Sequence, residues 1–185
     1  MRFPTRFRFL SKQEHIIASE VFGKKVPSRR KIIITNGAGL GDRAFTIPFS
    51  LILVLFMTLA AIPMGFITTI TVFITTVLST SLNFGYFVNV GKAYSNLDST
   101  NQAILIHEMV HVLQGEESFF SISYVVNSCF YQILQGRKAY CYVLGKKWKD
   151  YTAEQQAQII EDWFRNGKME DDVRRKYIDE NLRKS

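Results

Sequence analysis

The sequence contains few of the residues that most often bind metals or cross-link small proteins. Among its 185 residues are two cysteines, Cys129 and Cys141, and three histidines. The cysteines lie twelve positions apart, a spacing that matches no zinc or redox motif and supplies no disulfide framework. We therefore expect both cysteines to pack as small core hydrophobes.

Charged residues are missing from a long central stretch. No Asp, Glu, Lys, Arg or His occurs from 44 to 91, and Arg43 and Lys92 flank the stretch. Its two apolar halves, within about 44–82, are each just long enough for a membrane helix of about 20 residues, and the basic flanks suit a hairpin with both ends on the cytoplasmic side. We expect membrane contact through 44–82. The alternative, favoured by the many threonines of the second half, is a soluble helical pair buried against the domain.

The overall composition predicts one ordered and basic domain. Hydrophobic residues make up 47% of the chain and aromatic residues 14%, so we interpret 1–185 as a single domain with a packed core. The net charge of +7 suits an anionic partner. Charge is the only feature that favours nucleic-acid binding, so we expect no specific nucleic acid. The N-terminus, MRFPTRFRFL, lacks the apolar run and cleavage site of a cleavable signal peptide.

Periodicity and turn residues predict an α+β fold that is predominantly helical. Short β-branched or alternating runs at 31–36 and 84–91 indicate strands. A helix capped by Asp98 or Ser99 is expected to run through QAILIHEMVHVLQ, with the small sheet next to it. Further helices are predicted at about 118–144, from a cap at Thr152 to about Asn166-Gly167, and, as a charged C-terminal helix, at about 169–184.

The segment HEMVH carries the strongest chemical signal. In a helix, residues four apart share one face, so His107 and His111 can offer two imidazole nitrogens to one metal ion. Glu108 lies one step around the helix, outside the ligand set but within reach of a metal-bound water. An HExxH pattern on a helix therefore predicts a zinc ion, with Glu108 activating a zinc-bound water as general base.

A zinc site of this type needs a third protein ligand. The extended pattern HExxHxxGxxH fails, because Gln114 replaces the glycine and Glu117 stands where the last histidine would be. Glu116 and Glu117 are lesser candidates. Glu154 is our choice, since it lies on the predicted helix AEQQAQIIEDWF and would complete a site of two histidines and one glutamate, with Glu161 as the alternative ligand.

Supporting residues are harder to assign from the sequence. Asp162 could accept a hydrogen bond from a ligand histidine. Hydrolysis also needs a donor for the developing oxyanion, and Tyr140, Tyr142 and Tyr151 are available without an order of preference.

Four segments add a resemblance to a family; in chain order they are ITNGAGLGDRAFTIP, FVNVGKAYSN, LIHEMVHVLQ and YTAEQQAQIIEDWF. They resemble the metallopeptidase domains attached to bacterial type VI secretion spike proteins and related polymorphic-toxin effectors, over about 31–166 apart from the apolar insertion. The resemblance implies a zincin-like α+β fold, with zinc bound by His107, His111 and Glu154 in a gluzincin-like site and Glu108 as base. No spike or Rhs-repeat region precedes the domain, and the insertion is more hydrophobic than the corresponding linker, so a membrane-anchored housekeeping enzyme is an alternative.

These features lead to two functional hypotheses. The first is a bacterial zinc metallopeptidase that cleaves a peptide or protein substrate as an antibacterial or envelope-directed effector, with a secretion-machinery or immunity partner and a place at the membrane or in a target cell envelope. The second is a membrane-inserting or membrane-anchored protein whose 44–82 hairpin acts on lipid and whose metal site is structural or degenerate.

Overall fold

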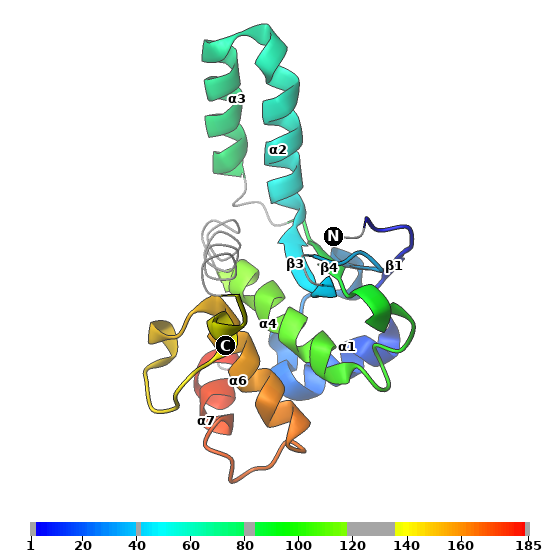
Figure 1. Cartoon of the computed structure of the whole chain (residues 1–185), viewed down its shortest axis with the longest axis vertical. Helices are drawn as coiled ribbons and strands as arrows, with labels where there is room; N and C mark the ends of the chain where they lie inside the picture. The colour runs from blue at the N-terminus through cyan, green and yellow to red at the C-terminus, as the bar shows by residue number, and fades with distance from the viewer. Residues whose placement is uncertain (1–2, 40–41, 80–83, 118–135, 184–185) are drawn as a thin grey trace.

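The computed structural model describes residues 3–39, 42–79, 84–117 and 136–183. It has an α+β architecture in which helices predominate, as the sequence predicts (Figure 1). Three helices form most of the body: α1 (Lys12–Phe22), α4 (Gln102–Glu117) and α6 (Ala153–Arg165). The small sheet lies at the end of this body from which a long helical hairpin projects.

The sheet is mixed and has four strands in the order β1-β2-β4-β3, with bounds β1 (Phe7–Phe9), β2 (Ile32–Thr35), β3 (Phe45–Pro48) and β4 (Tyr86–Asn89). β2 and β4 pair in parallel, which confirms the strands predicted at 31–36 and 84–91. The two edge strands run antiparallel to their neighbours. Pro48 closes the edge strand β3, a place where a missing backbone N–H does no harm.

One face of the sheet and the inner faces of the helices form the core. Ile32 and Ile34 of β2 and Tyr86 and Val88 of β4 are fully buried, while the intervening positions are partly exposed, as the two-residue period of a strand requires. They share a cluster with buried apolar residues of α1, α4 and α6. This packing fixes the helix that carries HEMVH against the sheet.

The N-cap predicted for α6 is confirmed, whereas those predicted for α4 are not. Thr152 and Gln155 form a capping box at the start of α6, and the helix ends at Asn166, as predicted. The predicted caps of α4 are wrong. The first helical hydrogen bonds go to the carbonyl of Asn101, because a turn separates Asp98 and Ser99 from the helix.

Two predicted helices are not formed as expected. Of 118–144, residues 118–135 lie outside the described part of the chain; Gly136–Tyr140 is a 3-10 turn, and a loop follows it rather than helix up to 144. Cys141, in that loop, is exposed instead of packing in the core; Cys129 lies outside the described residues.

The predicted helix at 169–184 is also wrong as a continuous element. The structure has only a short turn of α-helix, α7 (Arg175–Tyr177), followed by a π-turn at Ile178–Leu182. Asp172 accepts hydrogen bonds from the backbone N–H and the guanidinium of Arg174. This local pairing favours a turn over a first turn of helix.

The uncharged segment forms a hairpin of two helices, α2 (Phe49–Ala61) and α3 (Phe66–Ser79), joined by a 3-10 turn at Ile62–Met64 and by Gly65. The insertion therefore begins after β3, not at 44. Figure 1 shows the hairpin rising from the sheet end of the body. No helix in the described part of the chain is long and apolar enough to cross a membrane, so the two predicted spans are wrong in length.

A buried ion pair joins β1 to α1. The Glu14 carboxylate is 1% exposed and accepts hydrogen bonds from the Arg8 guanidinium at 2.6 and 2.7 Å, and Glu14 also forms a capping box with Ser11. Burial alone would raise the pKa of Glu14, but the hydrogen bonds from Arg8 and Ser11 outweigh it and hold the pKa below its ordinary value.

We predict that Glu14→Ala lowers the free energy of unfolding by roughly 2–3 kcal/mol, because Arg8 loses its partner and α1 loses one of the two hydrogen bonds of its capping box. The contribution of Glu14 is fully present above the ordinary glutamate pKa and is lost as the pH falls through the lower folded value. Urea denaturation at neutral and acid pH measures both effects. Glu20→Ala, on the exposed side of the same helix, is the control and should change stability little.

Candidate metal centre

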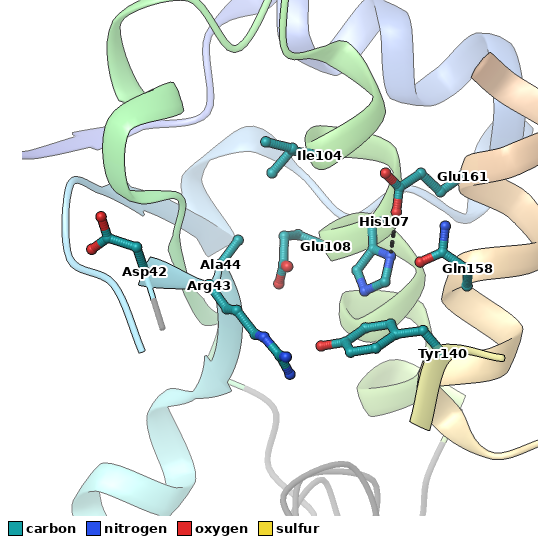
Figure 2. Close-up of a pocket in the computed structure, with 9 residues that line it drawn as sticks. All are labelled: Asp42, Arg43, Ala44, Ile104, His107, Glu108, Tyr140, Gln158 and Glu161. Atoms are coloured by element: carbon teal, nitrogen blue, oxygen red, sulfur yellow. Dashed lines mark hydrogen bonds and ion pairs between the residues drawn. The ribbon is translucent and has the colours of Figure 1, made fainter. Parts of the chain in front are cut away.

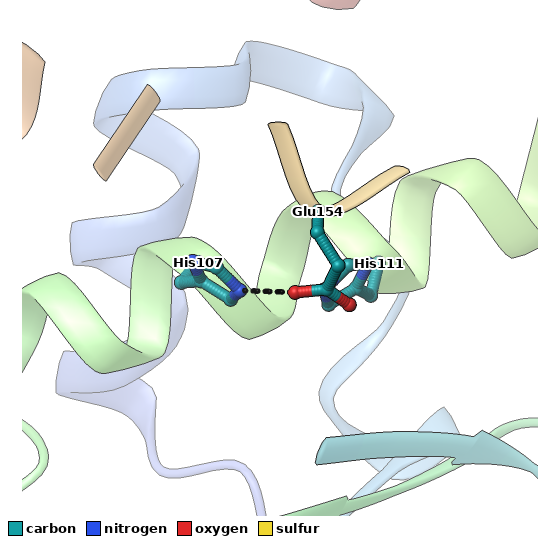
Figure 3. Close-up of side chains that lie close together, drawn as sticks. All are labelled: His107, His111 and Glu154. Atoms are coloured by element: carbon teal, nitrogen blue, oxygen red, sulfur yellow. Dashed lines mark ion pairs between the residues drawn. The ribbon is translucent and has the colours of Figure 1, made fainter. Parts of the chain in front are cut away.

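Three buried side chains from α4 and α6 meet where these helices pack together. The ligand atoms of His107, His111 and Glu154 all lie within 4.8 Å of one another (Figure 3). The Glu154 carboxylate lies between the two rings: its Oε2 is 3.5 Å from Nε2 of His107, and its Oε1 is 3.3 Å from Nε2 of His111. All three side chains are at most 10% exposed, so these atoms face one another rather than solvent.

The opposite nitrogen of each ring already has a hydrogen-bond partner. Nδ1 of His107 lies 2.9 Å from a carboxylate oxygen of Glu161, and Nδ1 of His111 lies 2.8 Å from Oε1 of Gln114. The Gln114 amide is oriented by its own donors, because its Nε2 donates to the backbone carbonyl of Ala153. The amide oxygen therefore faces His111, whose Nδ1 must be the donor. In the neutral ring this leaves the Nε2 lone pair pointing toward Glu154.

The charges of the cluster stabilise one another. Burial by itself lowers the pKa of His107, but hydrogen bonds to Glu154 and Glu161 outweigh it and raise the pKa to about 10. Burial disfavours the charged form of His111 too, yet the nearby Glu154 carboxylate raises its pKa. For Glu154 burial acts to raise the pKa, and the two histidines reverse this and hold it far below the ordinary value. Any metal cation that binds here replaces protons on the imidazoles.

The donor set and spacing fit a zinc ion. Zinc prefers imidazole nitrogen and carboxylate oxygen at about 2.0–2.1 Å, and at tetrahedral angles such ligand atoms lie roughly 3.3–3.4 Å apart. The nitrogen–oxygen separations of 3.5 and 3.3 Å, each to a different oxygen of Glu154, are of this size, and the three ligand atoms lie within 4.8 Å of one another. Three protein ligands leave a fourth position open, which is typical of catalytic rather than structural zinc sites.

Glu108 points into a cleft that His107 also lines (Figure 2). It is 2% exposed, and its Oε2 accepts a hydrogen bond of 2.8 Å from Thr46 of β3. Burial raises the pKa of Glu108, an effect that the two neighbouring histidines oppose only in part. The cleft has a volume of about 480 Å³, and its lining includes Arg43, Ile104, Tyr140 and Gln158.

The alternative ligands occupy other places. Glu161 lies on the far edge of the His107 ring, where it accepts from Nδ1 and pairs with Arg165 at 2.7 Å, so it is a partner of the ligand rather than a member of the cluster. Glu117 forms an ion pair with Lys25, and Glu116 lies at the exposed end of α4. Asp162 accepts hydrogen bonds from Tyr142 and Gln158 and not from a histidine, so the partner predicted for it is wrong.

The structure separates the three candidate tyrosines. The Tyr142 hydroxyl donates to Asp162 at 2.6 Å, and the Tyr151 hydroxyl donates to the carbonyl of Val143 at 2.9 Å. Neither residue is among those that line the cleft. Tyr140 lines the cleft, with its ring 6.0 Å from that of His107 and the Arg43 guanidinium 5.3 Å from its centre. Burial and the nearby Glu154 raise the pKa of Tyr140, which keeps its hydroxyl protonated.

Sequence reasoning missed Thr46 and Arg43, and it missed the role of Gln114. Thr46 lies 62 positions before Glu108, and Arg43 lies 97 positions before Tyr140, so no local pattern links either pair. Gln114 was noted only as a departure from a longer motif. Its spacing of three from His111 is the one signal that could have identified it, because such residues are neighbours on a helix.

No known protein-family model matches the chain, and no curated protein and no solved structure is detectably similar to it. The resemblance of its four segments to secretion-associated metallopeptidase domains stays a prediction.

We predict that Glu161→Ala weakens zinc binding about 10- to 100-fold, because His107 loses the acceptor that orients its ring. Competition with a chromophoric chelator measures the affinity. Glu161→Gln, which keeps a hydrogen-bond acceptor, should recover part of the loss. Glu116→Ala, near the exposed end of α4, is the matched control, and equal affinities for Glu161→Ala and this control would contradict the assigned role.

Proposed function

We propose that this chain is a zinc-dependent hydrolase of peptidase type with a gluzincin-like site on a zincin-like fold. The observation that carries the proposal is the convergence of His107, His111 and Glu154 on one point beside the buried carboxylate of Glu108. When bound there, zinc would act as a Lewis acid toward the substrate carbonyl and would make water more acidic.

Glu108 is the general base of the proposed reaction. Thr46 holds its Oε2, so Oε1 is the oxygen that can take a proton from the attacking water and pass it to the leaving amine. Because burial raises the pKa of Glu108, the carboxylate is a stronger base than an exposed glutamate. Its position one residue after His107 keeps it in the cleft but outside the ligand cluster.

Tyr140 and Arg43 are the donors on the opposite side of the cleft. Both line it, and the Tyr140 hydroxyl stays protonated because its pKa is raised. A protonated hydroxyl and a guanidinium can stabilise negative charge that develops on the carbonyl oxygen of a scissile amide. In this proposal the substrate is a peptide segment bound in the cleft.

The biological setting of the proposal rests on the resemblance of the four segments alone. From this resemblance we propose an antibacterial or envelope-directed effector that depends on a secretion-machinery partner and is neutralised by an immunity protein. The local chemistry supports the hydrolase independently of this setting.

Glu108→Gln should bind zinc as the parent does and lose at least about a hundred-fold in peptide cleavage, because the amide cannot accept the water proton. Zinc content by plasma mass spectrometry and cleavage of a mixed peptide library by mass spectrometry report the two properties separately. Glu116→Gln serves as the control with unchanged cleavage. Loss of zinc binding in the parent, or full cleavage by Glu108→Gln, would refute the proposal.

Tyr140→Phe should reduce turnover by roughly 100- to 1,000-fold, because one donor to the oxyanion disappears. Tyr142→Phe removes a hydroxyl that is bonded to Asp162 instead, so it should leave turnover nearly as it is. Single-turnover measurements on a peptide recovered from the library screen compare the two. Equal rates for both variants would exclude Tyr140 as the donor.

A further inference from the structure

The α2–α3 hairpin carries most of the exposed apolar surface of the described chain. Of 22 exposed large hydrophobic side chains, 13 lie between Ile52 and Ile74. At its base, Leu51 packs against the core cluster and Phe49 contacts Phe87 of β4, but the exposed apolar residues further out do not stabilise the body. Phe66 and Ile67, at the tip, are 79% and 81% exposed.

The exposed apolar surface is not a single stripe. At about 100° per residue, the exposed hydrophobic positions of α2 from Ile52 to Leu59 cover roughly 200° of the helix circumference. A helix that docks on one protein surface needs a stripe of about 100°, whereas a helix that is apolar nearly all round suits a medium that surrounds it. A lipid environment therefore matches this surface better than a groove or a second copy does.

The threonines of α3 are compatible with such a medium. Four of its five threonine hydroxyls donate to backbone carbonyls of the hairpin itself, at 2.7–3.0 Å: those of Thr69, Thr71, Thr75 and Thr76. A hydroxyl that is bonded to its own helix needs no water, which is how threonine is accommodated inside membranes.

The dimensions and the charges indicate how deep the hairpin reaches. α2 has 13 residues, or about 20 Å, which exceeds one leaflet of a hydrocarbon core about 30 Å thick without crossing it. At the sheet end of the body, from which the hairpin rises, the edge strand β1 exposes Phe7 and Phe9 beside Arg6 (Figure 1). Exposed aromatic side chains beside an exposed arginine suit an anionic headgroup layer.

We propose that the α2–α3 hairpin inserts into an anionic phospholipid bilayer from one side, without crossing it, and holds the body at the headgroup surface. The inference rests on the exposed residues of the hairpin and is independent of the zinc chemistry. It also implies that the cleft is held close to the membrane, because Arg43 and Thr46 belong to the segment that leads directly into α2.

Depth-dependent quenching tests the insertion directly. The full chain with Phe66→Trp is mixed with vesicles of phosphatidylcholine and phosphatidylglycerol whose acyl chains carry bromine. We expect fluorescence above that of the parent chain to be quenched, most strongly by bromines deep in the leaflet. Val143→Trp, at an equally exposed site outside the hairpin, is the matched control and should show no added quenching. Unquenched Phe66→Trp would overturn the proposal.

A second pair of variants measures the binding energy of the tip. Phe66→Asp combined with Ile67→Asp should lower vesicle partitioning by about a hundred-fold or more, because two carboxylates must enter the leaflet. Val143→Asp should leave partitioning unchanged. The tip variant should keep its circular dichroism spectrum and its zinc content, and Glu108→Gln should bind vesicles as the parent does, so failure of either proposal is seen separately.

Sedimentation velocity in lipid-free buffer distinguishes the main alternative occupant. If the hairpin instead covers a second copy of the chain, the parent sediments as a dimer that the tip variant dissociates, and vesicles quench no Phe66→Trp fluorescence. That combination would refute insertion. Partitioning that depends on the tip and is stronger with phosphatidylglycerol supports it.

Discussion

The placement of the Glu154 carboxylate between two imidazoles is the contact on which the candidate site depends. Three ionisable groups are withdrawn from water there, which is costly unless they neutralise one another. The ion pairs at 3.3 and 3.5 Å do so in the chain without metal, and a cation would do so with it. Because the partners come from α4 and α6, this contact also ties the two helices together.

The surrounding hydrogen bonds make the arrangement specific. Gln114 joins His111 to the backbone at the start of α6, and Glu161 reaches back from α6 to His107. Both histidines of α4 are thus oriented with the help of α6. A small shift of α6 would disturb Glu154, Glu161 and the carbonyl that anchors Gln114 at once, so the geometry of the centre and the packing of the helices are one constraint.

Local signals predicted well what local physics decides. The histidine pair, the Thr152 cap and the two central strands depend on spacings of two to four residues, and the structure has them in place. The continuous helix at 169–184 failed because side-chain pairing around Asp172 competes with helix formation, a competition that charge periodicity does not reveal. Glu154 was within reach because a capped helix, AEQQAQIIEDWF, offers Glu154 and Glu161 on one face. Thr46 and Arg43 were not, since only strand pairing brings them to α4.

The apolar segment shows where composition stops being informative. A run without charge from 44 to 91 is equally compatible with a spanning helix, a buried pair or an exposed hairpin, because hydropathy measures the preference of a side chain and not what covers it. The outcome was decided by two backbone features: Pro48, which ends β3, and the turn at Ile62–Met64, which ends α2 after 13 residues. β3 also supplies Thr46 to the cleft. The strand that positions the Glu108 carboxylate is therefore also the strand from which the hairpin leaves the body. The proposed catalytic cleft and the proposed membrane-inserting hairpin both depend on the position of β3.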